Sequence, residues 1–176
     1  METTRYVAGL LFDTAMTKVA LIKKQHGPPC MIGKWNAIGG KCNRDINGVW
    51  ESADAAMYRE YIEEADVSAP WTTFLVLTGR SWQVTFYKCF SSILLEGVAT
   101  KEDELVNVWP LNALPSPPDL VSNLRWIIPM ALTHVYEHVW VYTVHESETF
   151  VNTPQTHKLF PVDEVSIAIS RVASED

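Results

Sequence analysis

Residues 51–64, ESADAAMYREYIEE, contain no Gly or Pro and are rich in Ala, Glu and Met. This composition predicts an α-helix over residues 51–65. Glu60 lies three residues before Glu63 and four before Glu64, so the three side chains share one helix face. Like charges at this spacing destabilise a helix by about 0.2–0.5 kcal/mol per pair, and the helix dipole disfavours anions in its last turns. A bound divalent cation relieves both penalties, and clustered carboxylates suit Mg²⁺.

An acidic run by itself is most often a solvated surface, so the surrounding residues decide its meaning. Glu51 lies two helical turns before Arg59, and Glu63 lies four residues after it. Both carboxylates are therefore placed to pair with the guanidinium and orient it. Upstream, Gly39-Gly40 permits a tight turn from which a main-chain carbonyl can reach the same ion. The combination favours a metal site over a plain acidic face.

Alternation of apolar residues and turn formers outlines the rest of the chain. Strands are predicted over residues 5–12, 19–24, 35–38, 72–78, 83–90, 105–109 and 139–144, with one more at 164–170. A second helix is predicted over 120–132, with Leu124, Ile127, Ile128 and Ala131 on its core face and Pro129 kinking or ending it. This order predicts an α/β fold, a mixed β-sheet with helices on its faces, in a single domain spanning 1–176.

On the first helix, Ala55, Tyr58 and Ile62 recur at helical spacing and are predicted to face the core. The formal net charge is −7 and the sequence pI is about 5.2, which argues against a partner that is a long nucleic acid. No apolar run reaches the length of a membrane span, and three cysteines indicate reduced thiols. We therefore expect a cytoplasmic protein, a monomer or a homodimer.

The glutamate helix resembles the signature of the Nudix hydrolases. That signature is a Gly, five residues, a Glu, seven residues, then Arg-Glu-apolar-any-Glu-Glu-any-Gly-apolar. From Glu51 onward the spacing is that of the family, and a chance match to its five charged positions is on the order of one in ten thousand. The matching residues are Gly40, Glu51, Arg59, Glu60, Tyr61, Glu63, Glu64 and Val67.

Three features depart from that signature. Ten residues separate Gly40 from Glu51, Tyr61 replaces an aliphatic residue, and Asp66 replaces the second Gly. Asp66 is expected to tolerate the left-handed conformation that ends such helices. The departures leave every metal ligand in place, but the longer loop changes how the phosphates of a substrate are approached.

The resemblance implies a Nudix-type mixed β-sheet sandwiched between α-helices, and Mg²⁺ as the cofactor, with Mn²⁺ as an alternative. The metal ligands it implies are Glu60, Glu63, Glu64 and the carbonyl of Gly39. The general base is either a helix glutamate, Glu63 or Glu64, or Glu104 in the acidic loop 101–104. The alternative for Glu104 is an ordinary solvated loop charge.

Residues 34–41, KWNAIGGK, resemble the corresponding segment of oxidised-purine nucleoside triphosphatases of the MutT-homologue type. That resemblance covers roughly residues 5–145 and is specific in the first half of the chain. It implies that Asn36 contacts the base and that Lys23 lines the pocket. Candidate substrate contacts are Asn36, Lys23, Lys41 for phosphate, Asp119 for the base edge and Trp82 for stacking. The alternatives are an N-cap for Asp119, a partly buried hairpin residue for Trp82 and a solvated lysine for Lys41 or Lys23.

The resemblance thus implies a pyrophosphohydrolase that acts on a small nucleotide. We expect a nucleoside triphosphate, including one with an oxidised or modified purine, to be hydrolysed to the monophosphate and pyrophosphate. The alternatives are ADP-ribose or another nucleoside diphosphate derivative, a dinucleotide, or a Nudix-like module that binds a nucleotide without turnover. The five histidines form no motif with a nucleophile, so a metal-free hydrolase is disfavoured.

Overall fold

The computed structural model describes residues 3–101, 103–133 and 139–143. Seven strands within these ranges form one mixed sheet with the order β3-β2-β1-β5-β4-β7, and β6 joins it by pairing with β2. The pairs β1–β5 and β4–β7 are parallel and the other pairs are antiparallel. The strands are β1 (Thr4–Phe12), β2 (Lys18–Lys23), β3 (Trp35–Asn36), β4 (Thr72–Thr78), β5 (Trp82–Phe90), β6 (Leu105–Pro110) and β7 (Trp140–Thr143).

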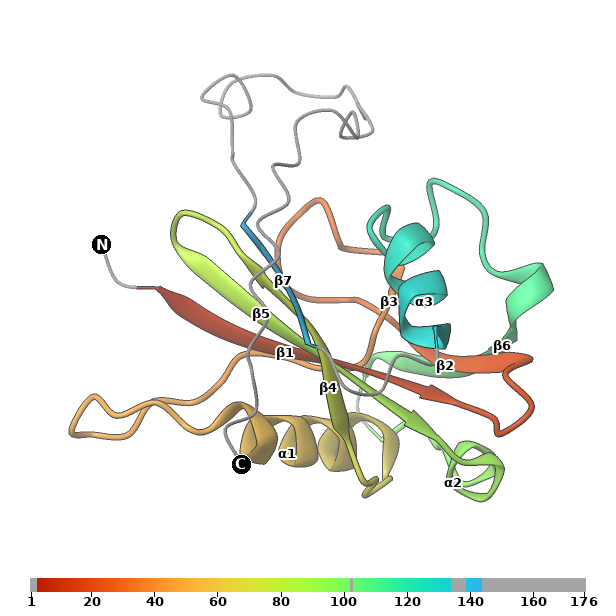
Figure 1. The fold of residues 1–176 in the computed structure, drawn as a ribbon, viewed down its shortest axis with the longest axis horizontal. Helices are drawn as coiled ribbons and strands as arrows, with labels where there is room; N and C mark the ends of the chain where they lie inside the picture. The colour runs from red at the N-terminus through yellow and green to blue at the C-terminus, as the bar shows by residue number, and fades with distance from the viewer. Residues whose placement is uncertain (1–2, 102, 134–138, 144–176) are drawn as a thin grey trace.

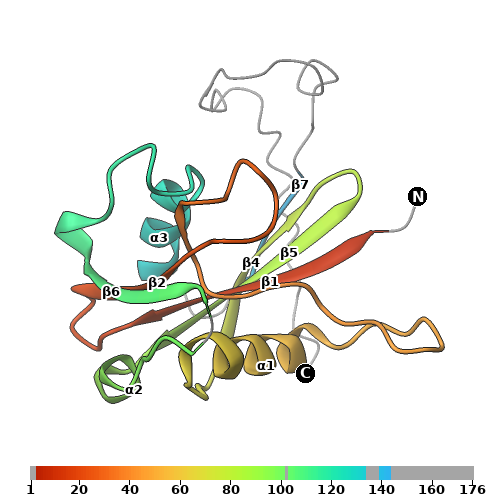
Figure 2. The same cartoon turned by 180° about the vertical axis from the view of Figure 1, so that it is seen from behind.

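Helices cover both faces of the sheet. In Figure 1, α1 (Ala53–Ala65) lies under one face and α3 (Leu124–Leu132) lies over the other, and Figure 2 shows the same arrangement from behind. The short helices α2 (Ser92–Glu96) and η1 (Leu111–Ala113) were not predicted. The predicted mixed sheet between helices is confirmed. Within the described ranges, no helix is long and apolar enough to cross a membrane.

Each face of the sheet packs its own apolar core. Leu21 belongs to the cluster under α3, and the next residue, Ile22, belongs to the cluster over α1. Successive side chains of a strand point to opposite faces, so Lys23 lies on the α3 side and Lys24, just past the end of the strand, on the α1 side. This alternation assigns the two neighbouring lysines to different surroundings.

Helix α1 begins and ends on residues that satisfy its free backbone groups. It begins at Ala53 rather than at the predicted Glu51, because the Ser52 side chain caps it by accepting a hydrogen bond from the Ala55 N–H at 3.2 Å. It ends at Asp66, whose φ of 58° is left-handed and whose N–H donates to the Ile62 carbonyl at 3.1 Å. The expectation for Asp66 is confirmed.

The predicted core face of α1 is wrong. Tyr58 and Ile62 are 40% and 45% exposed, and Ala55 is also exposed. The helix is turned so that Tyr61 packs against Trp71, with ring centroids 4.5 Å apart. Composition identified the helix correctly, but the spacing of its apolar residues indicated the wrong side of it. The buried residues are Ala56, Met57, Tyr61, Glu64 and Ala65.

The region around the second helix also differs from prediction. Helix α3 begins at Leu124, not at residue 120, because residues 119–121 lie extended along β3: Trp35 N–H donates to the Asp119 carbonyl at 2.7 Å, and Val121 N–H donates to the Trp35 carbonyl at 2.9 Å. The four predicted core residues of α3 are buried, and the helix continues three residues past Pro129. The predicted strand at 164–170 lies outside the described residues.

Candidate active site

The Gly39-Gly40 turn packs directly on the glutamate face of α1. The Gly39 N–H donates to Glu64 Oε2 at 3.0 Å, and Gly39 has a φ of 147°. A Cβ on Gly39 would lie 2.3 Å from the Val7 carbonyl oxygen, and a Cβ on Gly40 would lie 2.3 Å from Glu60 Oε2. Glycine at position 39 therefore lets the turn lie against β1, and glycine at position 40 lets it lie against Glu60.

Arg59 organises the exposed side of this cluster. Its guanidinium donates two hydrogen bonds to Glu51, at 3.1 and 2.9 Å, and one each to Glu60 at 2.7 Å and Glu63 at 3.0 Å. It also donates to the Lys41 carbonyl at 3.1 Å, which ties the loop after Gly40 to the helix. The expected pairing of Arg59 with Glu51 and Glu63 is present in the structure.

Glu51 gives this arrangement a pH dependence. Its two-point hydrogen bond with Arg59 lowers the pKa of Glu51 below its ordinary value, although partial burial acts in the opposite direction. A lowered pKa contributes stability that is present above the unfolded pKa and is lost as the pH falls through the folded pKa. The Arg59–Glu51 pair therefore stabilises the fold at neutral pH and ceases to do so in acid.

Replacing Glu51 by glutamine is expected to lower the free energy of unfolding at pH 7 by about 1 kcal/mol, because the bidentate ion pair is lost. Urea denaturation at a series of pH values measures this difference. The gap between wild type and variant should begin to narrow as the pH falls below the ordinary carboxyl pKa, and it should close below the lowered pKa of folded Glu51, where the carboxyl is protonated in both states. Glu96→Gln, an exposed glutamate at the end of α2, is the control. A gap that persists in acid would assign the loss to packing instead of charge.

Lys24, which sequence analysis did not identify, lies at the centre of the buried side. Its ammonium donates to Glu64 Oε1 at 2.8 Å, to Glu104 Oε2 at 2.9 Å and to the Gly39 carbonyl at 3.2 Å. Glu104 is only 8% exposed and accepts two further bonds at Oε1, from the backbone N–H groups of Gln25 and His26. The alternative of a solvated loop charge for Glu104 is therefore wrong. The alternation along β2 was the available signal for Lys24.

Burial and charge act in opposite directions on the pKa values of this cluster. Burial alone lowers the pKa of Lys24, but attraction to Glu64 and Glu104 outweighs it and raises the pKa of the ammonium. Burial favours a higher pKa for Glu104, yet the hydrogen bonds from Lys24 and from two backbone N–H groups lower it overall. Burial raises the pKa of Glu64 and of Glu60, against the pull of their cationic partners. The carboxylates depend on Lys24 and Arg59 for their charge.

The glutamates are divided between these two cations. Arg59 holds Glu60 and Glu63, and Lys24 holds Glu64 and Glu104. In the described part of the chain, no three His, Cys, Asp or Glu side chains converge on one point as metal ligands would. The donor set, carboxylates beside a main-chain carbonyl, consists of hard oxygens and fits Mg²⁺ by its chemistry.

The residues predicted to contact the base lie around β3. The hydrogen bond from the Trp35 N–H to the Asp119 carbonyl places this exposed aspartate beside the strand that carries Asn36. The Asn36 amide oxygen accepts from the Ala37 N–H at 2.9 Å, and its amide nitrogen lies 3.8 Å from the Met31 sulfur. Asp119 is not a helix N-cap, since α3 begins after Asn123. The structure thus places Asn36 and Asp119 on two adjacent, hydrogen-bonded segments, and the role of each stays a prediction.

The other predicted contacts are spread along the sheet. Lys23 is half-buried at the end of β2, in register with Trp35. Trp82 begins β5, with β1 and β2 between its strand and β3, and its ring lies against Gly79 in the hairpin. The structure therefore does not join Trp82 to Asn36 and Asp119.

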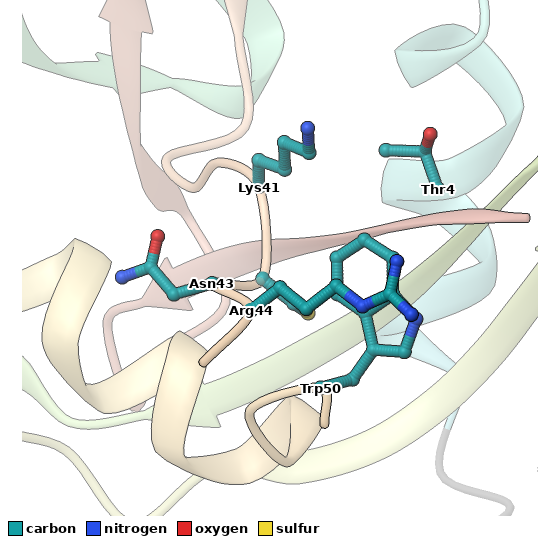
Figure 3. A pocket seen from close by; sticks show the side chains of 6 residues that line it. Thr4, Lys41, Asn43, Arg44 and Trp50 are labelled. Atoms are coloured by element: carbon teal, nitrogen blue, oxygen red, sulfur yellow. The ribbon is translucent and has the colours of Figure 1, made fainter. Parts of the chain in front are cut away.

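Lys41 lines a small surface pocket formed by the long loop. Figure 3 shows its side chain rising away from α1, while the Arg44 guanidinium lies over the Trp50 ring, 5.4 Å from the ring centre. The Lys41 backbone follows directly on Gly40, so this pocket adjoins the glycine turn. The pocket is lined by Thr4, Lys41, Cys42, Asn43, Arg44 and Trp50.

Comparison with solved structures defines the class of fold. A Nudix hydrolase from Nitrosomonas europaea matches with a TM-score of 0.59 and 15% identity, covering 83% of this chain and 81% of its own. A MutT Nudix hydrolase from Burkholderia pseudomallei matches with a TM-score of 0.58 and 22% identity, covering 76% and 100%. The chain therefore has the Nudix fold, with MutT-type proteins among its structural neighbours.

A third structural neighbour was solved with a ligand. It is the NUDIX domain of Shewanella oneidensis NrtR in complex with ADP ribose, with a TM-score of 0.53 and 21% identity, covering 74% of this chain and 87% of its own. No family model matches the sequence, and no curated protein matches it either. The similarity to Nudix proteins in these comparisons is therefore a similarity of tertiary structure.

Proposed function

We propose that this protein is a Mg²⁺-dependent Nudix hydrolase that converts a nucleoside triphosphate to the monophosphate and pyrophosphate. The observation that carries the proposal is the direct packing of the Gly39-Gly40 turn on the glutamates of α1, through the 3.0 Å contact of Gly39 N–H with Glu64. The Nudix fold of the chain supports it. If the glutamates of α1 were an ordinary solvated surface, no close packing of the Gly39-Gly40 turn on this helix would be expected.

In this proposal Glu60, Glu63, Glu64 and the Gly39 carbonyl hold the metal. When bound, Mg²⁺ neutralises charge on the phosphates and lowers the pKa of a coordinated water. Arg59 and Glu51 orient the glutamates from the side. Lys41 provides a positive charge for the outgoing phosphates, next to the turn.

Glu63 is the general base that the contacts favour. Its side chain is 47% exposed and its ion pair with Arg59 engages Oε2, so Oε1 remains available to take a proton from the attacking water. Both oxygens of Glu104 are engaged, by Lys24 and by two backbone N–H groups. Water adds to phosphorus, the anhydride P–O bond breaks, pyrophosphate leaves, and the proton of the water passes to Glu63.

Asn36 and Asp119 are assigned to the base of the nucleotide, oxidised or modified purines included. An amide and a carboxylate together offer the donors and acceptors that a base edge requires. Replacing Asn36 by alanine is expected to lower kcat/KM for the preferred triphosphate by about 10- to 100-fold relative to other bases. Steady-state kinetics on several triphosphates measure this change, with Asn112→Ala, an exposed asparagine in η1, as the control. An equal loss for every base would remove Asn36 from base recognition.

A second candidate substrate is ADP-ribose or a related nucleoside diphosphate derivative. The observation that favours it is the structural neighbour solved with ADP ribose. The ten-residue loop and the pocket around Lys41 and Arg44 leave space beside the turn for a group beyond the diphosphate. A nucleotide-binding module without turnover is the remaining alternative.

Product analysis by chromatography separates these functions. The protein is incubated with Mg²⁺ and normal and oxidised nucleoside triphosphates, ADP-ribose and a diadenosine polyphosphate, with and without a chelator. We expect monophosphate and pyrophosphate from a triphosphate, and no product in the chelator. Cleavage of ADP-ribose or the dinucleotide alone would transfer the assignment to the second candidate. Tight binding of a nucleotide with no product would indicate the non-catalytic module.

A further inference from the structure

The Lys24 ammonium is surrounded by oxygens from three separate segments. It contacts the Gly39 carbonyl at the turn, Glu64 on α1 and Glu104 before β6, at 3.2, 2.8 and 2.9 Å. The Lys24 side chain is 14% exposed and the two glutamate side chains are each 9% exposed. These lengths suit N–H···O bonds to an ammonium, whereas Mg²⁺ requires oxygens at about 2.0–2.1 Å.

Two of these three oxygen sources are also ligands in the proposed metal site. Gly39 and Glu64 belong to the Mg²⁺ ligand set, and the remaining two members, Glu60 and Glu63, lie on the Arg59 side of α1. Lys24 therefore neutralises one half of the carboxylate cluster from inside the protein. A buried carboxylate that loses its partner carries a large cost, so a cation between Glu64 and Glu104 stabilises this half of the cluster.

We propose that Lys24 is a positioning residue that serves as a built-in cation of the active site, taking the place of one divalent ion between Gly39, Glu64 and Glu104. This inference rests on the proposed metal-dependent function and adds a property of this chain to it. Lys24 also joins Glu104 to Glu64, so it holds the loop before β6 against α1. A divalent ion held by the proposed ligand set then reaches Gly39 and Glu64 from the side of Glu60 and Glu63, opposite the ammonium.

The alternative is that Lys24 forms a purely structural ion pair. Both readings predict that its loss destabilises the metal-free protein, because Glu64 and Glu104 are left as unpaired buried charges. Only the built-in cation predicts that a divalent ion enters in place of the ammonium. The number of bound ions therefore separates the two readings.

The test counts bound Mn²⁺ by electron paramagnetic resonance of the free ion during titration. Wild type is compared with Lys24→Met and Lys24→Arg, and with Lys18→Met, an exposed lysine on the same strand, as control. We expect Lys24→Met to bind one more Mn²⁺ per chain than wild type. Lys24→Arg keeps the charge and should bind the wild-type number, as should Lys18→Met.

Thermal melting provides a second measurement in case Lys24→Met folds poorly without metal. Saturating Mn²⁺ should raise the Tm of Lys24→Met by more than it raises the wild-type Tm, because the ion replaces a missing internal charge. Equal Mn²⁺ stoichiometry and equal Tm shifts in the two proteins would overturn the role of Lys24 and leave the hydrolase proposal intact. An absence of Mn²⁺ binding in wild type and variant alike would overturn the metal-dependent function as well.

Discussion

Replacing Glu63 by glutamine is expected to lower kcat by about 10² to 10⁴-fold, the range for loss of a general base, while the fold is retained. Glutamine has nearly the same shape but no charge, so it neither accepts the proton of the attacking water nor binds a divalent ion well. Glu63 is half exposed and its ion pair with Arg59 spans one helical turn. Exposed pairs of this kind contribute about 0–1 kcal/mol, so stability should change little.

Rates of product formation at saturating substrate measure this effect, and urea denaturation checks stability in the same preparation. Glu96→Gln is the matched control, because it makes the same chemical change on the exposed end of α2. A Glu63→Gln protein that turns over at the wild-type rate would remove Glu63 from both the metal site and the proton transfer. If the fall in the free energy of unfolding were large enough to account for the fall in kcat, Glu63 would act by maintaining the fold.

Alanine at Gly39 and alanine at Gly40 are expected to differ in their main effect, on stability at Gly39 and on metal binding at Gly40. Gly39 has a φ of 147°, and its new Cβ would lie 2.3 Å from the Val7 carbonyl oxygen. A change in the Gly39 backbone conformation or a shift of the Val7 carbonyl in β1 would each cost a large amount of free energy. We expect Gly39→Ala to lower the free energy of unfolding by about 3–5 kcal/mol, combining backbone strain with overpacking.

At Gly40 the new Cβ would instead meet the Glu60 carboxylate, with Oε2 at 2.3 Å. The end of a flexible side chain can rotate away, so the fold survives and the carboxylate leaves its place beside the turn. We expect Gly40→Ala to lose less than half as much stability as Gly39→Ala but to bind Mn²⁺ at least about tenfold more weakly. Melting curves and metal titrations of the two variants measure the contrast. Wild-type metal affinity in a folded Gly40→Ala protein would exclude Glu60 as a ligand.

Local sequence patterns were sufficient to predict the helix on which the candidate site residues lie. The run of residues without Gly or Pro predicted α1, and the spacing of Glu60, Glu63 and Glu64 predicted a shared face. Asp66 was expected to end the helix in a left-handed conformation, and it does. Side-chain spacing on one helix is set by helix geometry alone, so such inferences need no knowledge of the rest of the fold.

Contacts between segments that are distant in the sequence could not be predicted from those local patterns. The face of α1 that turns inward depends on Trp71 and on the sheet above it, which is why Tyr58 and Ile62 were placed in the core wrongly. The late start of α3 depends on the pairing of residues 119–121 with β3. In both cases a tertiary contact outweighs the local preference of the segment.

The sequence by itself indicated the class of fold, through the order of its predicted strands and helices. It also indicated the carboxylates of the candidate site, because helix spacing and the Gly-Gly turn are local properties. Only the tertiary structure decided how those carboxylates are shared. Lys24 and Glu104 are 80 residues apart in the chain and meet at 2.9 Å, and Glu104 is buried by that meeting. A buried charge can persist only beside its partner, and the partner is supplied by the packing of strands and loops that are distant in sequence.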